Sequence, residues 1–190
     1  MTKKVLLALM CLVLMCCMLC ACSTAPEQTV LDQFSAQVKD AKSITADILV
    51  KDANGMEVAS GTVVMDFASK QRTVTLKTPN TEFTADGNAW KTENSTSAYP
   101  TDTVAFGWKV KDFSQIVYDA QNLCCDGVIG ADVVKQLGLA DVVSSVQGTV
   151  SVKLLVSGDV ESSITVNKVV VSYLSENNNT VTITLTTQAK

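Results

Sequence analysis

The sequence predicts an α+β fold: a curved antiparallel β-sheet with an N-terminal helix, and short helices that cover the concave face of the sheet. Three observations lead to this prediction. Apolar residues repeat with helical spacing between Thr29 and Lys42, and with a two-residue period from Ser43 onward. Turn signals interrupt the two-residue pattern at short intervals, as in antiparallel meanders. Two further stretches, residues 112–123 and 131–143, return to helical spacing.

The first residues have the pattern of an export signal. Lys3 and Lys4 precede an uncharged apolar stretch from Val5 to Ala21, which small residues end. We interpret residues 1–21 as a signal peptide. The alternative is an uncleaved signal anchor, in which the cysteine that follows has no special role.

The end of this stretch, Leu19-Cys20-Ala21-Cys22, resembles the bacterial lipobox, in which a leucine and two small residues precede an obligatory cysteine. The resemblance implies cleavage before Cys22, a diacylglyceryl group on its sulfur, and further acylation such as palmitate. Residues 22–28 would then be a short lipidated tether. The resemblance also implies a domain held on the extracytoplasmic side of a bacterial membrane, at the cell surface or in the periplasm.

Composition excludes several classes of function. The chain has no histidine, which removes Ser-His-Asp and Cys-His nucleophiles and most zinc sites. The glycines lie singly at turns, so there is no phosphate-binding loop. A net charge of −4 with scattered basic residues gives no footprint for nucleic acid. We therefore predict no enzyme, cofactor or metal, and no nucleic-acid partner.

The helical spacing predicts an amphipathic helix over residues 29–42. Its apolar face holds Val30, Leu31, Phe34, Val38 and Ala41. Thr29 is the predicted N-cap, and Lys39 and Lys42 fall in the predicted last turn.

The two-residue period then predicts a meander of five short strands. They comprise residues 43–51, 57–67, 72–78, 81–85 and 88–92. Turns are predicted at Asn54-Gly55, 69–71, Pro79-Asn80 and Asp86-Gly87.

The remaining chain is predicted to complete the same sheet. Residues 93–102 are a predicted loop or flap, and 103–110 a further strand. Helical segments are predicted over 112–123 and over 131–143, the second broken near Gly138. Strands follow at 148–157, 162–173 and 180–187, so that residues 29–190 form a single domain.

Cys124 and Cys125 are adjacent, and they are the only cysteines after Cys22. One interpretation is a vicinal disulfide that acts as a redox switch. The other is a pair of thiols at a helix break, one of them buried and packed like a small apolar side chain.

The order of these elements resembles the lipoprotein-carrier superfamily, the LolA/LolB-like proteins with the LprG/LppX lipoproteins of similar fold. The resemblance rests on a helix that enters Lys42-Ser43-Ile44-Thr45-Ala46-Asp47, and on the later hairpin Thr84-Ala85-Asp86-Gly87-Asn88-Ala89-Trp90. It implies an incomplete barrel, closed by helices, that holds an acyl chain or a lipidated partner. Carriers of the LolA type use a cavity arginine, but we do not equate it with Arg72, the only arginine here.

Two functional hypotheses follow. In the first, an anchored lipoprotein binds an acyl chain, a lipid or a lipidated protein in an apolar cavity under the sheet. The predicted ligand-binding residues are Val63, Met65, Phe67, Leu76, Phe83, Trp90, Val181 and Ile183. In the second, these side chains only fill the core, and the protein is a structural or interaction lipoprotein without a ligand.

Overall fold

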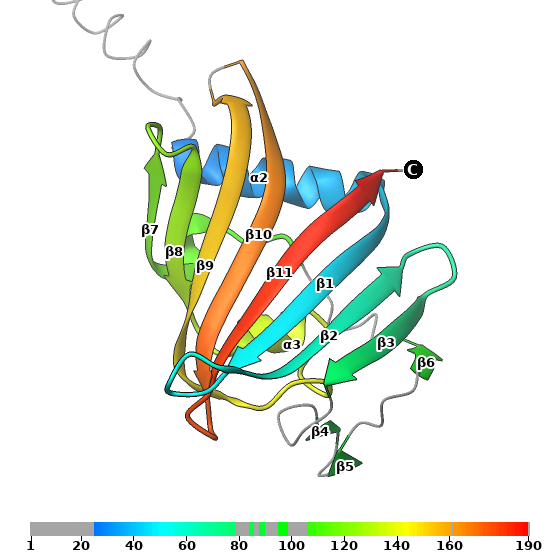
Figure 1. Ribbon diagram of the computed structural model, residues 1–190. Coiled ribbons are helices and arrows are strands. Elements are labelled where there is room, and N and C mark those ends of the chain that lie inside the picture. The colour runs from blue at the N-terminus through cyan, green and yellow to red at the C-terminus, as the bar shows by residue number, and fades with distance from the viewer. Residues whose placement is uncertain are drawn as a thin grey trace, which may run out of the picture.

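The computed structural model describes residues 25–78, 84–85, 88–89, 95–98, 106–160 and 162–189. Within them, nine strands form one antiparallel sheet in the order β6-β3-β2-β1-β11-β10-β9-β8-β7. The sheet is curved and does not close into a barrel (Figure 1). The signal peptide, Cys22, and the predicted ligand residues Phe83 and Trp90 lie outside the described residues.

The elements have the following bounds. The helices are α2 (Pro26–Asp40), the single 3-10 turn η1 (Val110–Asp112) and α3 (Asp132–Gln136). The strands are β1 (Ala41–Lys51), β2 (Glu57–Asp66), β3 (Gln71–Thr78), β6 (Ser95–Ala98), β7 (Phe113–Asp119), β8 (Cys124–Ile129), β9 (Val146–Asp159), β10 (Ser163–Ser175) and β11 (Thr180–Ala189), with β4 (Thr84–Ala85) and β5 (Asn88–Ala89) as a separate hairpin.

The helix α2 starts earlier than the sequence predicted. Pro26 occupies its first turn, where a missing N–H costs nothing, so the predicted N-cap Thr29 already lies inside the helix. The chain passes from Asp40 directly into β1, and Lys42 is a strand residue. The predicted apolar face is confirmed for Val30, Leu31, Phe34 and Val38, which are all buried, whereas Ala41 is the first residue of β1.

The first and last strands meet in the middle of the sheet. β1 pairs with β2 on one side and with β11 on the other, with Ala46 opposite both Val63 and Leu185. The predicted Asn54-Gly55 turn is confirmed: Gly55 has a φ of +79°, and the Asp52 carboxylate accepts the amide of Asn54. Because β11 pairs with β1 and β10, and β10 with β9, the closing strands complete one sheet, as the sequence predicted.

The prediction of a helix over residues 112–123 is wrong. This stretch is the strand β7 and the turn into β8, and the predicted interruption at Cys124 is the start of β8. A bulge between Phe113 and Gln115 inserts one residue, so the apolar side chains follow a spacing that also fits a helix. Val117 of the expected helix face is instead 53% exposed.

Residues 106–109 are irregular, which contradicts the strand predicted over 103–110, although Phe106 and Trp108 are buried as the alternation indicated. Part of the predicted 93–102 loop is the strand β6, which pairs with β3. Ala85 pairs with Asn88, while Asp86 and Gly87 of the predicted turn lie outside the described residues. The second helical prediction is confirmed only as the short α3, and Gly138, with a φ of +69°, lies at the predicted break.

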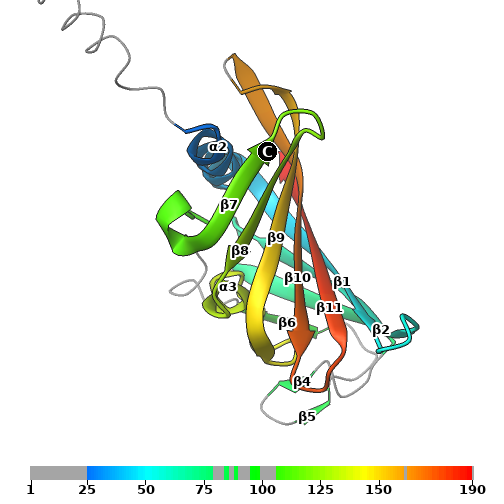
Figure 2. The same cartoon turned by 90° about the vertical axis from the view of Figure 1, so that its left-hand side faces the viewer.

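The two helices lie on the same side of the sheet (Figure 2). α2 crosses the strands near one end of the sheet, where it contacts β10, β1, β7 and β11. Within the described residues, no helix combines the length and apolar character that crossing a membrane requires.

Candidate functional site: the concave face of the sheet

Alternate residues of the central and flanking strands form one apolar layer on the concave face. The register aligns Ile48 of β1 with Ile183 of β11, and Val171 of β10 with the same Ile183. Val152 of β9 is aligned with Val171 in turn. All four side chains are at most 2% exposed, so the apolar layer extends across the sheet without a break at these positions.

Five of the predicted ligand-binding residues lie together on this face. Val63, Met65, Val181 and Ile183 are 0% exposed and Leu76 is 4% exposed. Phe67 follows the end of β2, is partly buried and packs against the same core. The structure thus places these side chains where the sequence predicted, while their role toward a ligand stays a prediction.

Among the described residues, the cover of the concave face comes from α2, the short α3 and irregular segments. One part is α2, whose Phe34 packs against Phe106 and Trp108 at ring-centroid distances of 6.0 and 5.7 Å. The Trp108 indole donates to Gln136 of α3 over 3.0 Å, which joins the irregular segment to the short helix. The other part is the segment after α3, which contributes Leu139, Val142 and Val143 to the core.

A buried ion pair fastens this cover to the sheet. Arg72 of β3 is 3% exposed and lies opposite Met65. Its Nη1 donates to the Gly138 carbonyl over 2.7 Å and to Asp141 Oδ1 over 2.6 Å, and its Nη2 donates to Asp141 Oδ2. Arg72 Nε has no hydrogen-bond partner among the described residues. The guanidinium therefore binds the segment after α3 at two residues, Gly138 and Asp141.

Arg72 was not among the ligand-binding residues predicted from the sequence. The available signal was its phase on the strand, because Arg72 shares the alternation of Val74 and Leu76, both of which face inward. A charged residue at an inward position usually has a buried partner. That partner, Asp141, is 69 residues away in sequence, and no local pattern connects the two.

The two cysteines behave as packed thiols. Both are free and buried, and as neighbours on β8 they point to opposite faces of the sheet. Burial raises the pKa of Cys125 to about 12, and burial with the nearby Asp126 raises the pKa of Cys124. A thiol that stays protonated is a poor nucleophile, so this arrangement favours packing over a redox switch.

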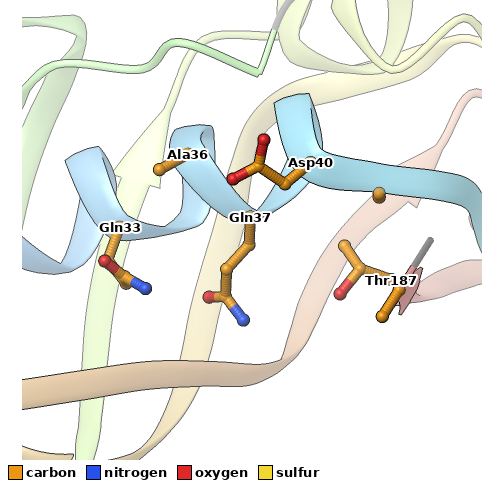
Figure 3. A pocket seen from close by; sticks show the side chains of 7 residues that line it. Gln33, Ala36, Gln37, Asp40 and Thr187 are labelled. Carbon is orange, nitrogen blue, oxygen red and sulfur yellow. The ribbon is translucent and has the colours of Figure 1, made fainter.

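A groove of about 260 Å³ lies between the C-terminal half of α2 and the end of β11 (Figure 3). It is lined by Gln33, Ala36, Gln37, Asp40, Ala41, Thr187 and Ala189. Gln37 is already engaged, since its side chain exchanges two hydrogen bonds with the Val166 backbone. The lining is polar or small, so this groove differs from the apolar cavity that the sequence predicted. The described residues hold no group of three His, Cys, Asp or Glu side chains that would suit a metal ion.

The sequence matches no protein-family model and no curated protein. Among solved structures, the chain is similar to the lipoprotein LppX of Mycobacterium tuberculosis, with a TM-score of 0.51 and 12% identity over 87% of this chain and 95% of that one. LprF of Mycobacterium bovis aligns with a TM-score of 0.43 and 15% identity, over 87% of this chain and 94% of that one. The likeness to LppX shows that this chain has the same fold as LppX, which confirms the predicted fold resemblance.

Proposed function

We propose that the mature protein is an extracytoplasmic lipoprotein, anchored through Cys22, that binds an apolar ligand between the curved sheet and its cover. The ligand class is an acyl chain, a lipid or a lipidated protein. The observation that carries this proposal is the unbroken apolar layer of the concave face. Among the described residues, α2, the short α3 and irregular segments cover this layer.

The nature of the cover supports ligand entry. The amides of Leu139, Val142 and Val143 bond only to nearby carbonyls, those of Val134 and Leu139, and locally bonded segments open at a lower free-energy cost than paired strands. Displacing these side chains would expose Val63, Met65 and Leu76 without separating any strand pair. The apolar area that the cover releases would be buried again by the ligand.

The chemistry of the face predicts loose specificity. Its side chains are almost all aliphatic, with Arg72 of β3 as a buried cation. Few fixed polar groups mean that chain length and bulk, more than head-group chemistry, would decide which ligands bind. A binding role needs no catalytic group, and we assign none.

The test is ligand capture by the mature chain carrying Cys22→Ala, which removes its own acyl groups. We expect co-purified lipid in native mass spectra and displacement of a fluorescent fatty acid at micromolar ligand. A photoactivatable fatty acid should crosslink to peptides that contain Met65 or Ile183. Crosslinks confined to convex-face peptides, or no displacement at all, would overturn the binding proposal.

The second candidate is a structural or interaction lipoprotein with a filled core. One observation favours it: Val63, Met65, Leu76, Val181 and Ile183 are at most 4% exposed with protein side chains alone around them. If this candidate holds, delipidated and lipid-exposed protein will have the same unfolding temperature. A bound ligand would raise that temperature in proportion to the logarithm of its concentration.

A further inference from the structure

The turn between β7 and β8 exposes apolar side chains at one end of the sheet. Leu123 is 41% exposed in this turn, and Val117 of β7 is 53% exposed on the convex face. The other large apolar side chains that are exposed in the described residues, Met56 and Leu174, belong to the opposite end of the sheet (Figure 1).

Leu123 breaks two local preferences at once. Its φ is +49°, in the left-handed region that favours Gly and Asn over a bulky side chain. The other non-glycine residues with positive φ in the described chain are Lys70 and Asn178, both polar. Leucine at this position neither favours the left-handed backbone conformation of the turn nor buries its side chain. Residues that break local preferences in this way gather at functional sites.

The turn is held firmly in this shape. The Asp119 carboxylate accepts the amides of Gln121 and Asn122, over 2.9 and 3.0 Å. The Leu123 carbonyl accepts the Val156 amide of β9 over 2.9 Å. The backbone therefore presents the Leu123 side chain in a fixed position, which lowers the entropy that any contact of this side chain would cost.

The same end of the sheet receives the membrane tether. Glu27, the second residue of α2, accepts the Tyr118 amide of β7 over 3.0 Å, so α2 begins beside the end of this hairpin. The covalent chain from Cys22 to Ala25 spans at most about 11 Å. A lipid on Cys22 therefore holds the start of α2, and with it the β7–β8 hairpin, close to the bilayer surface.

The charges within the hairpin itself favour an apolar contact, and the neighbouring β9–β10 turn adds Asp159 at the same end of the sheet. Residues 113–129 contain no lysine or arginine, so the hairpin has no cation of its own for anionic head groups. Its acidic groups are engaged: Asp119 binds its own turn, and Asp126 pairs with Lys153 of β9 at 3.2 Å.

We propose that Leu123, together with Val117 of the same hairpin, contacts the leaflet that holds the Cys22 lipid and orients the domain with the β7–β8 hairpin toward the bilayer. The inference rests on the proposed anchorage at Cys22 and adds a second membrane contact to it. The acyl chains on Cys22 hold the protein at the membrane but leave the domain free to turn on its tether, and a second contact fixes its orientation. This orientation places α2 and the adjoining edge of the sheet near the lipid phase.

The test uses the lipidated chain on phosphatidylcholine vesicles. Nitroxide labels are placed through Gln121→Cys in the β7–β8 turn and, as the matched control, Asn177→Cys in the exposed β10–β11 turn. The chain without either substitution controls for labelling of the buried native thiols. We expect the ratio of collisions with oxygen to collisions with a water-soluble nickel chelate to be several-fold higher at position 121 than at 177.

Substitution of the contact residue completes the test. Leu123→Asn suits the left-handed backbone, and Val117→Thr keeps a β-branched strand residue, so both variants should fold. Leu123→Asn should lower the ratio at position 121 to that at position 177, and Val117→Thr should lower it in part. Equal ratios in the parent chain, or a high ratio that persists in Leu123→Asn, would overturn the inference while the anchor stands. Failure of the lipidated chain to float with vesicles would instead refute the anchorage and the inference with it.

Discussion

Removing the carboxylate of Asp141 should destabilise the fold far more than removing the guanidinium that it binds. In Asp141→Ala, the buried Arg72 keeps its charge and only the Gly138 carbonyl as a partner. Breaking a buried ion pair from one side costs about 3–5 kcal/mol, because the remaining charge is uncompensated. Asp141 is 45% exposed, so water can reach part of the vacated space, and we expect a loss of about 2–3 kcal/mol in the free energy of unfolding.

Arg72→Met leads to the opposite expectation. Methionine fills a similar volume, and the half-exposed Asp141 remains solvated. The main loss is the donor to the Gly138 carbonyl, which is worth about 1 kcal/mol. The double variant should be about as stable as Arg72→Met alone. Without Arg72, the Asp141 carboxylate has no buried cation to neutralise, so its removal costs little.

Urea unfolding followed by circular dichroism measures the difference. With a slope of about 2–3 kcal/mol per molar urea, Asp141→Ala should lower the midpoint by about 1 M. A loss below about 1 kcal/mol for Asp141→Ala, or a larger loss for Arg72→Met, would refute the claim that this ion pair fastens the cover.

Three further predictions concern other parts of the chain. Gly158→Ala should lower the unfolding temperature, because Gly158 has a φ of +89° and an added Cβ would lie 2.1 Å from the Ser163 carbonyl oxygen. The control Gly130→Ala, whose added Cβ has no atom within 4 Å, should leave the unfolding temperature unchanged. Cys125 should resist alkylation by iodoacetamide at pH 8 unless the chain is unfolded. Because folding raises the pKa of Cys125 from 9.0 to about 12, the unfolded chain releases this proton first, and stability in urea should fall as the pH rises above about 9. Cys22→Ala should move the protein from the membrane to the soluble fraction without changing fatty-acid displacement.

Local patterns predicted the parts of the fold where one face of the chain is buried. Alternation in β1 places Ile44, Ala46, Ile48 and Val50 on the core side, and all four are buried. Such runs leave a single register that buries their apolar side chains, so the strand and its facing direction follow from sequence.

The β7–β8 region shows where such patterns fail. A bulge after Phe113 changes the phase of the alternation, and the shifted spacing of Phe113, Ile116 and Val117 is shared by a helix face. Only pairing with β8, and of β8 with β9, decides between the two structures. The pairing of β7 with β8 joins residues 5 to 16 positions apart, and that of β8 with β9 joins residues 21 to 31 positions apart, so a short window does not include most of these contacts.

The candidate site was predictable in its aliphatic part and not in its polar part. Val63, Met65, Val181 and Ile183 were found because they share the phase of their strands. The pairing of Arg72 with Asp141 depends on how the segment after α3 returns to β3, and this return has no signature in sequence.

The pairing of β1 with β11 has a consequence for folding. A chain made from its N-terminus forms β1 early, yet the strand that completes the centre of the sheet is made last, and the Ser43 hydroxyl bonds Gln188 across 145 residues. Until β11 arrives, β1 presents an open edge that other chains can join. Pairing over such a separation is slow, because a long loop must close first. Truncation of β11 should therefore make this protein aggregate, even though β11 is only one of the nine strands of the sheet.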